Sequence, residues 1–196
     1  MTAENGLILY FAPGSSSMAV HIALHEIGVA FEPRPLSFRN EMRRPDFLAV
    51  NPAGKVPTLV VGGQPLTEVA AILFYLAKRF PDAALLPRDD LMAEAQALSW
   101  MSFIASTLHP ARRQGIDHVE HVYGIADRRL GAGWALGAYS VADIHLFRLY
   151  WRMMQSRQPA PGAFPNLDAH HQRMMARPAV QRTIAIETAI GYELPA

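Results

Sequence analysis

The spacing of apolar residues changes once along this chain, near Pro81, and that change is the strongest constraint on its fold. Before Pro81, short apolar runs of strand length alternate with stretches in which apolar residues recur every three or four positions. After Pro81, the helical spacing persists through the rest of the sequence. The pattern predicts a small α/β domain followed by an all-α domain.

The first eighty residues predict the order strand, helix, strand, strand, strand, helix. An apolar run at 7–11 ends at a Pro-Gly turn, and the helical spacing that follows three serines ends at Gly28. Two prolines confine the next strand, at 31–37, to a sheet edge. Residues 58–66 predict a hairpin around Gly-Gly, and 69–80 predict a helix that stops before Pro81.

The Pro- and Asp-rich stretch 82–89 predicts a linker between a domain of residues 1–81 and a helical domain of residues 90–196. One long amphipathic helix is expected from Leu91 to Leu108. Further on, Ser140 followed by Asp143 resembles a capping box at the start of another helix. Two short helices are expected beyond Pro165, separated at Pro178.

Composition excludes several classes of partner and chemistry. Eighteen Lys and Arg against seventeen Asp and Glu give a net charge of +1, far from the basic field typical of a nucleic-acid binder. The 196 residues contain no cysteine, which excludes disulfides, a Cys-ligated metal and a cysteine nucleophile. Any thiol chemistry therefore depends on a thiol that the substrate brings.

No signal peptide and no apolar run near the ~20 residues of a membrane span occur, so a cytoplasmic protein without a membrane partner is expected. The pairs His21/His25 and His118/His121 have helical metal-ligand spacing. Because neither pair has an identifiable third ligand, no metal site is predicted.

Two local features suggest a binding edge. Pro57 stands where a strand begins: a cis Val56-Pro57 bond would turn the Val56 backbone outward to pair with a peptide-like ligand, whereas a trans bond would simply open the strand. Glu68 precedes a helix N-terminus, and this corner would suit a ligand carrying both a carboxylate and an ammonium. Alone, a Glu at this position is more often just a favourable charge at a helix N-terminus.

Five motifs in order carry a family resemblance: residues 9–11, Gly-Ser-Ser-Ser at 14–17, Asn-Pro-Ala-Gly-Lys-Val-Pro at 51–57, residues 66–72, and Ser-Val-Ala-Asp at 140–143. Together they resemble cytosolic glutathione transferases, and the serine turn with 107–110 most resembles the bacterial beta class. The resemblance implies a thioredoxin-like N-terminal domain, an all-α C-terminal domain and a homodimer.

The resemblance also implies a glutathione site. Val56, before a cis Pro57, would bind the cysteinyl backbone, and Glu68 would hold the γ-glutamyl ammonium. The family usually has serine where this chain has Val69, so only the backbone N–H remains there for the γ-glutamyl carboxylate. Lys55 could approach a carboxylate of the tripeptide.

The residue that faces the thiol is open among three. Beta-class relatives often have cysteine where this chain has Ser16, and Tyr10 aligns with the tyrosine that other classes use. Ser17 is a further hydroxyl at the helix start, although each serine also suits a plain N-cap. His109 aligns with a histidine that lines the family's active site from the second domain.

The resemblance implies an enzyme that activates the glutathione thiol, as co-substrate, for attack on a small hydrophobic electrophile, with detoxification as its role. The alternatives are a non-catalytic member that binds glutathione or another ligand, and a glutathione-dependent isomerase or dehalogenase. The segment 110–139, with Gly131, Gly133 and Gly137, looks short for the family. It predicts a truncated helix and a more open electrophile pocket.

Overall fold

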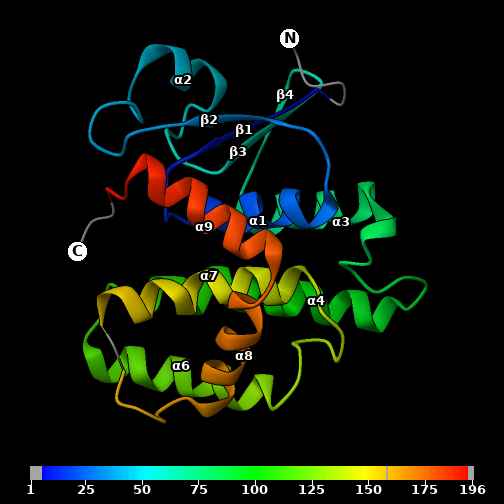
Figure 1. Ribbon diagram of the computed structural model, residues 1–196, viewed down its shortest axis with the longest axis vertical. Coiled ribbons are helices and arrows are strands. Elements are labelled where there is room, and N and C mark those ends of the chain that lie inside the picture. The colour runs from blue at the N-terminus through cyan, green and yellow to red at the C-terminus, as the bar shows by residue number, and fades with distance from the viewer. Residues whose placement is uncertain (1–5, 158, 194–196) are drawn as a thin grey trace. The chain divides into compact units, whose positions relative to one another are not determined.

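The computed structural model describes residues 6–157 and 159–193. The chain forms two compact units. One consists of the described residues up to Leu76 together with those from Pro178 onward, and the other is Ala77–Arg177. The element order can be followed by colour in Figure 1.

The first unit contains a four-stranded mixed sheet in the order β2-β1-β3-β4. Its strands are β1 (Leu7–Phe11), β2 (Glu32–Pro35), β3 (Thr58–Val61) and β4 (Gln64–Thr67). β2 runs parallel to β1, and the other pairs are antiparallel. The predicted order of the strands along the chain, the edge position of the proline-containing strand and the hairpin are confirmed.

Three helices belong to the N-terminal part of the chain: α1 (Ser17–Ile27), α2 (Pro45–Val50) and α3 (Val69–Arg79). α1 ends as predicted at Gly28, which has a left-handed φ of 74°. The six-residue α2 was not predicted, because it is shorter than two turns and shows no period. Phe47 of α2 packs on the Tyr10 ring, with centroids 5.3 Å apart.

The last helix, α9 (Pro178–Ile190), packs on α1 in the first unit (Figure 1). Its buried residues Val180, Thr183 and Glu187 fall at i, i+3 and i+7, a single helical stripe. Thr183 Oγ1 lies 2.9 Å from His25 Nδ1 of α1. The predicted boundary at residues 82–89 would place α9 in the C-terminal domain. In the structure α9 belongs to the first unit, because its buried stripe packs on α1.

The second unit is helical. After the short turn η1 (Pro81–Ala83), its elements are α4 (Leu91–Phe103), the π-helical turn η2 (Ile104–Leu108), α5 (His109–Ala111), α6 (Ile116–Leu130), α7 (Val141–Ser156) and α8 (Pro165–Met175). Its core includes Trp100, Ile104, Leu108, Val122, Leu146, Tyr150 and Leu167. The predicted capping box is confirmed at α7, where the Ser140 N–H donates to Asp143 Oδ2 over 2.9 Å.

The expected truncation before Ser140 is wrong. α6 has 15 residues, close to the 16 of α7. The three glycines that suggested a short helix, Gly131, Gly133 and Gly137, lie beyond its end, in the loop that leads to Ser140. Because these glycines do not shorten α6, they give no reason to expect a more open electrophile pocket.

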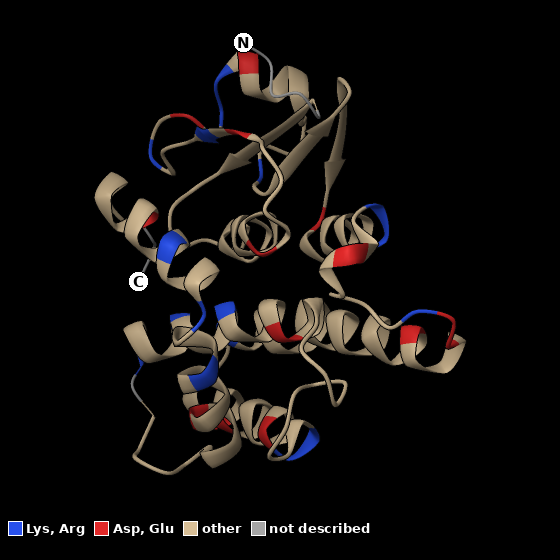
Figure 2. Cartoon of the chain, turned by 45° about the vertical axis from the view of Figure 1, so that its right-hand side comes forward, with Lys and Arg blue, Asp and Glu red and all other residues tan. Residues whose placement is uncertain are grey.

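Basic and acidic residues occur in both units (Figure 2), and over the whole sequence they leave a net charge of +1. None of the helices in the described segments is both long and apolar enough to cross a membrane. Within the same segments, no group of three or more His, Asp or Glu could hold a metal ion. His21 and His25 instead contact Glu187 and Thr183.

Candidate functional site

The strand register brings the predicted site residues of the first unit to one end of the sheet. Tyr10 of β1 pairs with Thr58 of β3, which pairs with Thr67 of β4. The end of β1, the start of β3 and the end of β4 therefore lie side by side. The loop to α1, the Val56-Pro57 bond and Glu68 all extend from this end.

The Val56-Pro57 peptide bond is cis. Around it, buried Asn51 donates through Nδ2 to the Lys55 carbonyl at 2.8 Å and to Thr58 Oγ1 at 2.9 Å. Within the described part of the chain, the N–H of half-exposed Val56 makes no hydrogen bond. The turn thus presents a backbone donor to a ligand. Sequence reasoning did not identify Asn51 and Thr58 as its supports, although Asn51 opens the motif at 51–57.

Gly54 is required in this turn. Its φ is +58°, and an added Cβ would lie 2.7 Å from the Met42 carbonyl oxygen. Any other residue would have to displace the backbone that carries Val56.

Ser16 stands at the N-cap of α1, yet its side chain makes no capping hydrogen bond. Its hydroxyl donates instead to the Val56 carbonyl at 3.3 Å, which is long for an O–H···O bond. Ser16 is also partly exposed. A hydroxyl held by one weak bond can turn toward an incoming anion, and the positive end of the α1 dipole favours that anion.

Ser17 is in a different environment. It is fully buried, and its Oγ lies 2.6 Å from Ser15 Oγ and donates to the Ala12 carbonyl at 3.2 Å. The Ala12 N–H in turn donates to Ser17 Oγ at 3.1 Å. These bonds hold the turn that carries Ser16, and they leave the Ser17 hydroxyl inside it.

The Tyr10 hydroxyl is also engaged elsewhere. It accepts a hydrogen bond of 2.6 Å from Arg34 Nη1 on β2. The ring is 9% exposed and packs on Phe47. Tyr10 therefore belongs to the apolar cluster between the sheet and α2.

Glu68 has the left-handed backbone that non-glycine residues rarely adopt, with φ of 68°. Its carbonyl accepts from the Ile72 N–H, so it stands where α3 begins, next to Val69. Its exposed carboxylate makes no hydrogen bond or ion pair with the described residues. A carboxylate beside a helix N-terminus can take an ammonium, while the N-terminus can take a carboxylate. Lys55 is exposed one residue before Val56.

One buried contact that sequence reasoning missed supports the loop before α1. Glu187 of α9 is fully buried and accepts hydrogen bonds from the Gly14 N–H, at 2.6 Å, and His21 Nδ1, at 2.9 Å. Gly14 and Glu187 are 173 residues apart, so no local pattern could reveal the pair. The only signal was a lone Glu on the apolar stripe of α9.

A cavity of about 360 Å³ opens beside this loop. Its apolar walls come from Pro13, Pro35, Leu36, Phe38, Ile190 and Tyr192. Across it, Ser37 Oγ donates to Glu193 Oε2 at 2.6 Å. The cavity is wide enough for an aromatic ring. One of its walls, Pro13, is three positions before Ser16 in the sequence.

His109 lies in the second unit, just after the π-helical turn η2. Burial, followed by the positive charges of Arg148, Arg112 and Arg113, lowers the pKa of His109 to about 4. Its imidazole is therefore neutral at pH 7 and can donate or accept a hydrogen bond.

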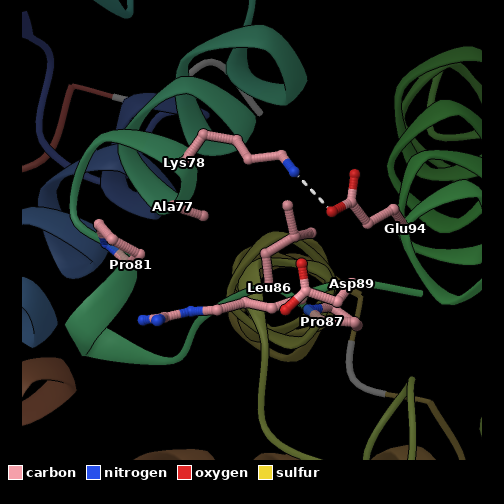
Figure 3. A pocket seen from close by; sticks show the side chains of 8 residues that line it. Ala77, Lys78, Pro81, Leu86, Pro87, Asp89 and Glu94 are labelled. Carbon is pink, nitrogen blue, oxygen red and sulfur yellow. Dashed lines mark hydrogen bonds and ion pairs between the residues drawn. The ribbon is translucent and has the colours of Figure 1, made fainter. Parts of the chain in front are cut away.

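A second cavity, of about 210 Å³, lies in this unit beside the end of α3 (Figure 3). Lys78 points across it and forms an ion pair with Glu94. Arg88 lies 3.6 Å from Asp82. Lys78, Glu94 and Arg88 are thus each in an ion pair, and the exposed Asp89 also lines the cavity.

The comparisons with known proteins agree with this geometry. Residues 5–78 match the glutathione S-transferase N-terminal domain, and residues 106–178 match the glutathione S-transferase C-terminal domain. A Xanthomonas campestris protein named glutathione S-transferase GST-4.5 is 30% identical, covering 91% of this chain and 98% of that protein. The chain belongs to the glutathione S-transferase family.

Solved structures support the same assignment. The bacterial beta-class glutathione S-transferase of Sphingomonas chungbukensis is 35% identical, with a TM-score of 0.83 over 92% of this chain and 98% of that one. A sphingomonad glutathione S-transferase complexed with glutathione is 32% identical, with the same TM-score over 92% and 98%. The resemblance to bacterial beta-class members of the family is confirmed.

Within this glutathione S-transferase fold, Ser16 and the Val56-Pro57 turn meet at hydrogen-bond distance, and Glu68 with Val69 lies at the same end of the sheet. Tyr10 is turned toward Arg34, and Ser17 lies inside its turn. The roles of these residues stay predictions.

Proposed function

We propose that this member of the glutathione S-transferase family is an enzyme that binds glutathione along Val56 and Glu68 and stabilises its thiolate through Ser16. The thiol proton passes to solvent, and the thiolate then attacks an electrophilic carbon of a small apolar second substrate, so that a C–S bond forms while the bond to a leaving anion such as chloride breaks. The observation that carries this proposal is the position of the Ser16 hydroxyl. Ser16 is partly exposed, its hydroxyl makes no capping hydrogen bond to α1, and it lies 3.3 Å from the Val56 carbonyl oxygen.

The geometry supports each step. A cysteinyl backbone paired with Val56 would bring its thiol near Ser16, because the two residues face each other. A free thiol with a pKa near 8.5 is mostly protonated at pH 7, and a hydroxyl donor at a helix N-terminus lowers that value. The apolar cavity beside Pro13 supports an apolar electrophile. His109, in the second unit, is a separate candidate whose neutral imidazole can donate or accept a hydrogen bond at pH 7.

The test is an ultraviolet difference titration of glutathione at neutral pH, with S-methylglutathione as the blank. Because the chain has no cysteine, any thiolate band belongs to the ligand. We expect a saturable band, and we expect Ser16→Ala to weaken it and to lower kcat with 1-chloro-2,4-dinitrobenzene by about 10–10³, as for the loss of one preorganised donor. Tyr10→Phe should leave both the thiolate band and kcat unchanged.

The opposite result, with Ser16→Ala fully active and Tyr10→Phe inactive, would overturn the Ser16 assignment. Saturable binding without a thiolate band would favour a non-catalytic glutathione-binding protein. A product formed without consumption of glutathione would favour the isomerase alternative. A cytoplasmic location and a role in detoxification stay predictions.

We also infer a homodimer. α4 buries one face, which includes Ala97 and Trp100, and exposes Leu91 (85%), Met92 (69%) and Leu98 (44%) on the other. Apolar side chains exposed in a row on one helix are typical of an interface. Sedimentation should give twice the 21.7 kDa chain mass, and Leu91→Glu should reduce it to that of one chain. A monomeric wild-type protein would contradict the inference.

A further inference from the structure

The apolar cavity beside Pro13 is lined by residues of the first unit alone. Three of its wall residues, Phe38, Ile190 and Tyr192, are large apolar side chains that are 37%, 48% and 39% exposed. Apolar side chains that gather around a concave site and stay exposed to water are typical of a ligand site. The cavity therefore has the character of a binding site for an apolar molecule.

The charged side chains at the cavity are acidic. Glu41 and Glu193 line it, and no lysine or arginine is among the described residues that do so. Glu41 accepts a hydrogen bond from the Ser37 N–H at 2.8 Å, and Glu193 accepts one from the Ser37 hydroxyl at 2.6 Å. An anionic ligand would meet acceptors here and no cation, so the cost of removing its charge from water would not be offset. The cavity thus favours an uncharged ligand.

The C-terminal wall of the cavity is a short segment, residues 190–193, in which the chain leaves α9. The helix ends at Ile190, and Gly191 turns the chain away with a φ of +100°. The Tyr192 hydroxyl lies 2.9 Å from Thr188 Oγ1, so Tyr192 contacts the helix that it has just left. We call residues 190–193 the C-terminal strap.

Glu193 connects this strap to the opposite wall of the cavity, through its hydrogen bond with the Ser37 hydroxyl. The Ser37 hydroxyl, followed by the backbone and the charge of Arg39, holds the pKa of Glu193 below its ordinary value. Ser37 Oγ in turn accepts from the Arg39 N–H at 3.2 Å. These partners can all return to water, so the connection is strong enough to close the strap and weak enough to open.

The strand register brings the cavity to the end of the sheet that carries the Ser16 turn. Phe11, the last residue of β1, pairs with Pro35, and its carbonyl accepts from the Leu36 N–H at 2.7 Å. Pro13 and Ser16 follow Phe11 in the loop to α1. A ligand in the cavity and a thiolate at Ser16 would therefore lie at the same end of one sheet.

Resting on the function proposed above, we propose that the C-terminal strap opens to admit an uncharged aromatic second substrate and then closes over it, with the Ser37–Glu193 hydrogen bond as its latch. The bound ring covers the exposed faces of Phe38, Ile190 and Tyr192. Entry depends on the fraction of molecules in which the latch is open. The strap thus controls how fast the cavity fills.

Stopped-flow fluorescence of the whole protein with N-phenyl-1-naphthylamine, an uncharged probe that brightens in apolar surroundings, measures entry and exit without turnover. Glu193→Ala removes the acceptor of the latch, so the association and dissociation rate constants should both rise about tenfold, as for the loss of one hydrogen bond to a charged group. Glu193→Gln keeps an acceptor for the Ser37 hydroxyl and should restore most of the wild-type rates. An association rate constant that Glu193→Ala leaves unchanged would overturn the strap.

A matched pair of isoleucines tests where the probe binds. Ile190→Gln should weaken probe binding about tenfold, because Ile190 lines the cavity. Ile116→Gln, at a 46% exposed position of α6 in the other unit, should leave it unchanged. Wild-type affinity in Ile190→Gln, or displacement of the probe by saturating S-methylglutathione, would place the probe outside the cavity and refute the proposal.

Two competitors of similar size test the charge of the ligand. Uncharged 2-naphthamide should displace the probe at a concentration about tenfold lower than anionic 2-naphthoate requires, because the carboxylate meets only acceptors in the cavity. Equal displacement by the two compounds would contradict the assigned ligand class.

Turnover separates this proposal from the function beneath it. Ile190→Gln should lower kcat/KM for 1-chloro-2,4-dinitrobenzene about tenfold and leave the glutathione thiolate band unchanged. A wild-type protein that shows no thiolate band and consumes no glutathione would refute the proposed function, while the probe kinetics still decide whether the strap controls entry. Wild-type turnover together with unchanged probe kinetics in Glu193→Ala would refute the strap alone.

Discussion

At the scale of single residues, burial holds histidines of both units in their neutral form. Burial, then His109 and Arg148, lowers the pKa of His145 to about 3, and burial, then His21 and Arg182, lowers that of His25 to about 4. In the unfolded chain a histidine titrates near 6.5. As the pH falls below about 6.5, the unfolded chain takes up protons that the folded chain does not, so the free energy of unfolding decreases.

The His145→Gln variant tests this at one fully buried position. Between pH 7 and pH 5, the free energy of urea unfolding should fall for the wild-type protein, and the variant should reduce that fall by up to about 2 kcal/mol, because 1.36 kcal/mol corresponds to one pKa unit. His118→Gln, at an exposed position of α6, should leave the pH dependence unchanged. A His145→Gln variant with the wild-type pH dependence would contradict the assignment.

At the scale of elements, hydrogen bonds to one buried carboxylate stabilise the start of α7. The fully buried Asp143 carboxylate accepts from the Ser140 N–H and Oγ, both at 2.9 Å, and from the Ala135 N–H at 2.8 Å. Ser140→Ala should lower the free energy of unfolding by about 1–2 kcal/mol, the upper range for an N-cap. Ser156→Ala, at the other end of α7, should change it by less than about 0.5 kcal/mol. Equal effects would count against the capping box.

At the scale of the whole chain, the first unit depends on a helix encoded at the opposite end. Glu187→Ala would remove the buried carboxylate that accepts from the Gly14 N–H and from His21, so the free energy of unfolding should fall by about 2–4 kcal/mol. The glutathione thiolate band should weaken with it, because Gly14 leads into the Ser16 turn. Thr188→Ala, at an exposed neighbouring position, should change neither. If the Glu187→Ala variant kept the wild-type stability and thiolate band, the turn that carries Ser16 would not need its hydrogen bond to Glu187.

Sequence reasoning succeeded where the deciding contacts are between near neighbours. Gly28 ends α1, Ser140 and Asp143 start α7, and the hairpin forms around Gly62 and Gly63. It also located the serine turn and the Val56-Pro57 edge. It did not find α2, because six residues are too few to show a helical period. It also did not tell which of the three serines is buried and which is partly exposed, because the three side chains are identical and only their surroundings differ.

By itself, the sequence determined the order of strands and helices, the helix caps and the absence of any protein thiol. These follow from residue identity and from contacts a few positions apart. Only the tertiary structure decided that the Ser16 hydroxyl faces Val56, that Arg34 donates to the Tyr10 hydroxyl and that α9 belongs to the first unit. The physical reason is that exposure, pairing and local charge depend on residues far apart in the chain, and no local period encodes them.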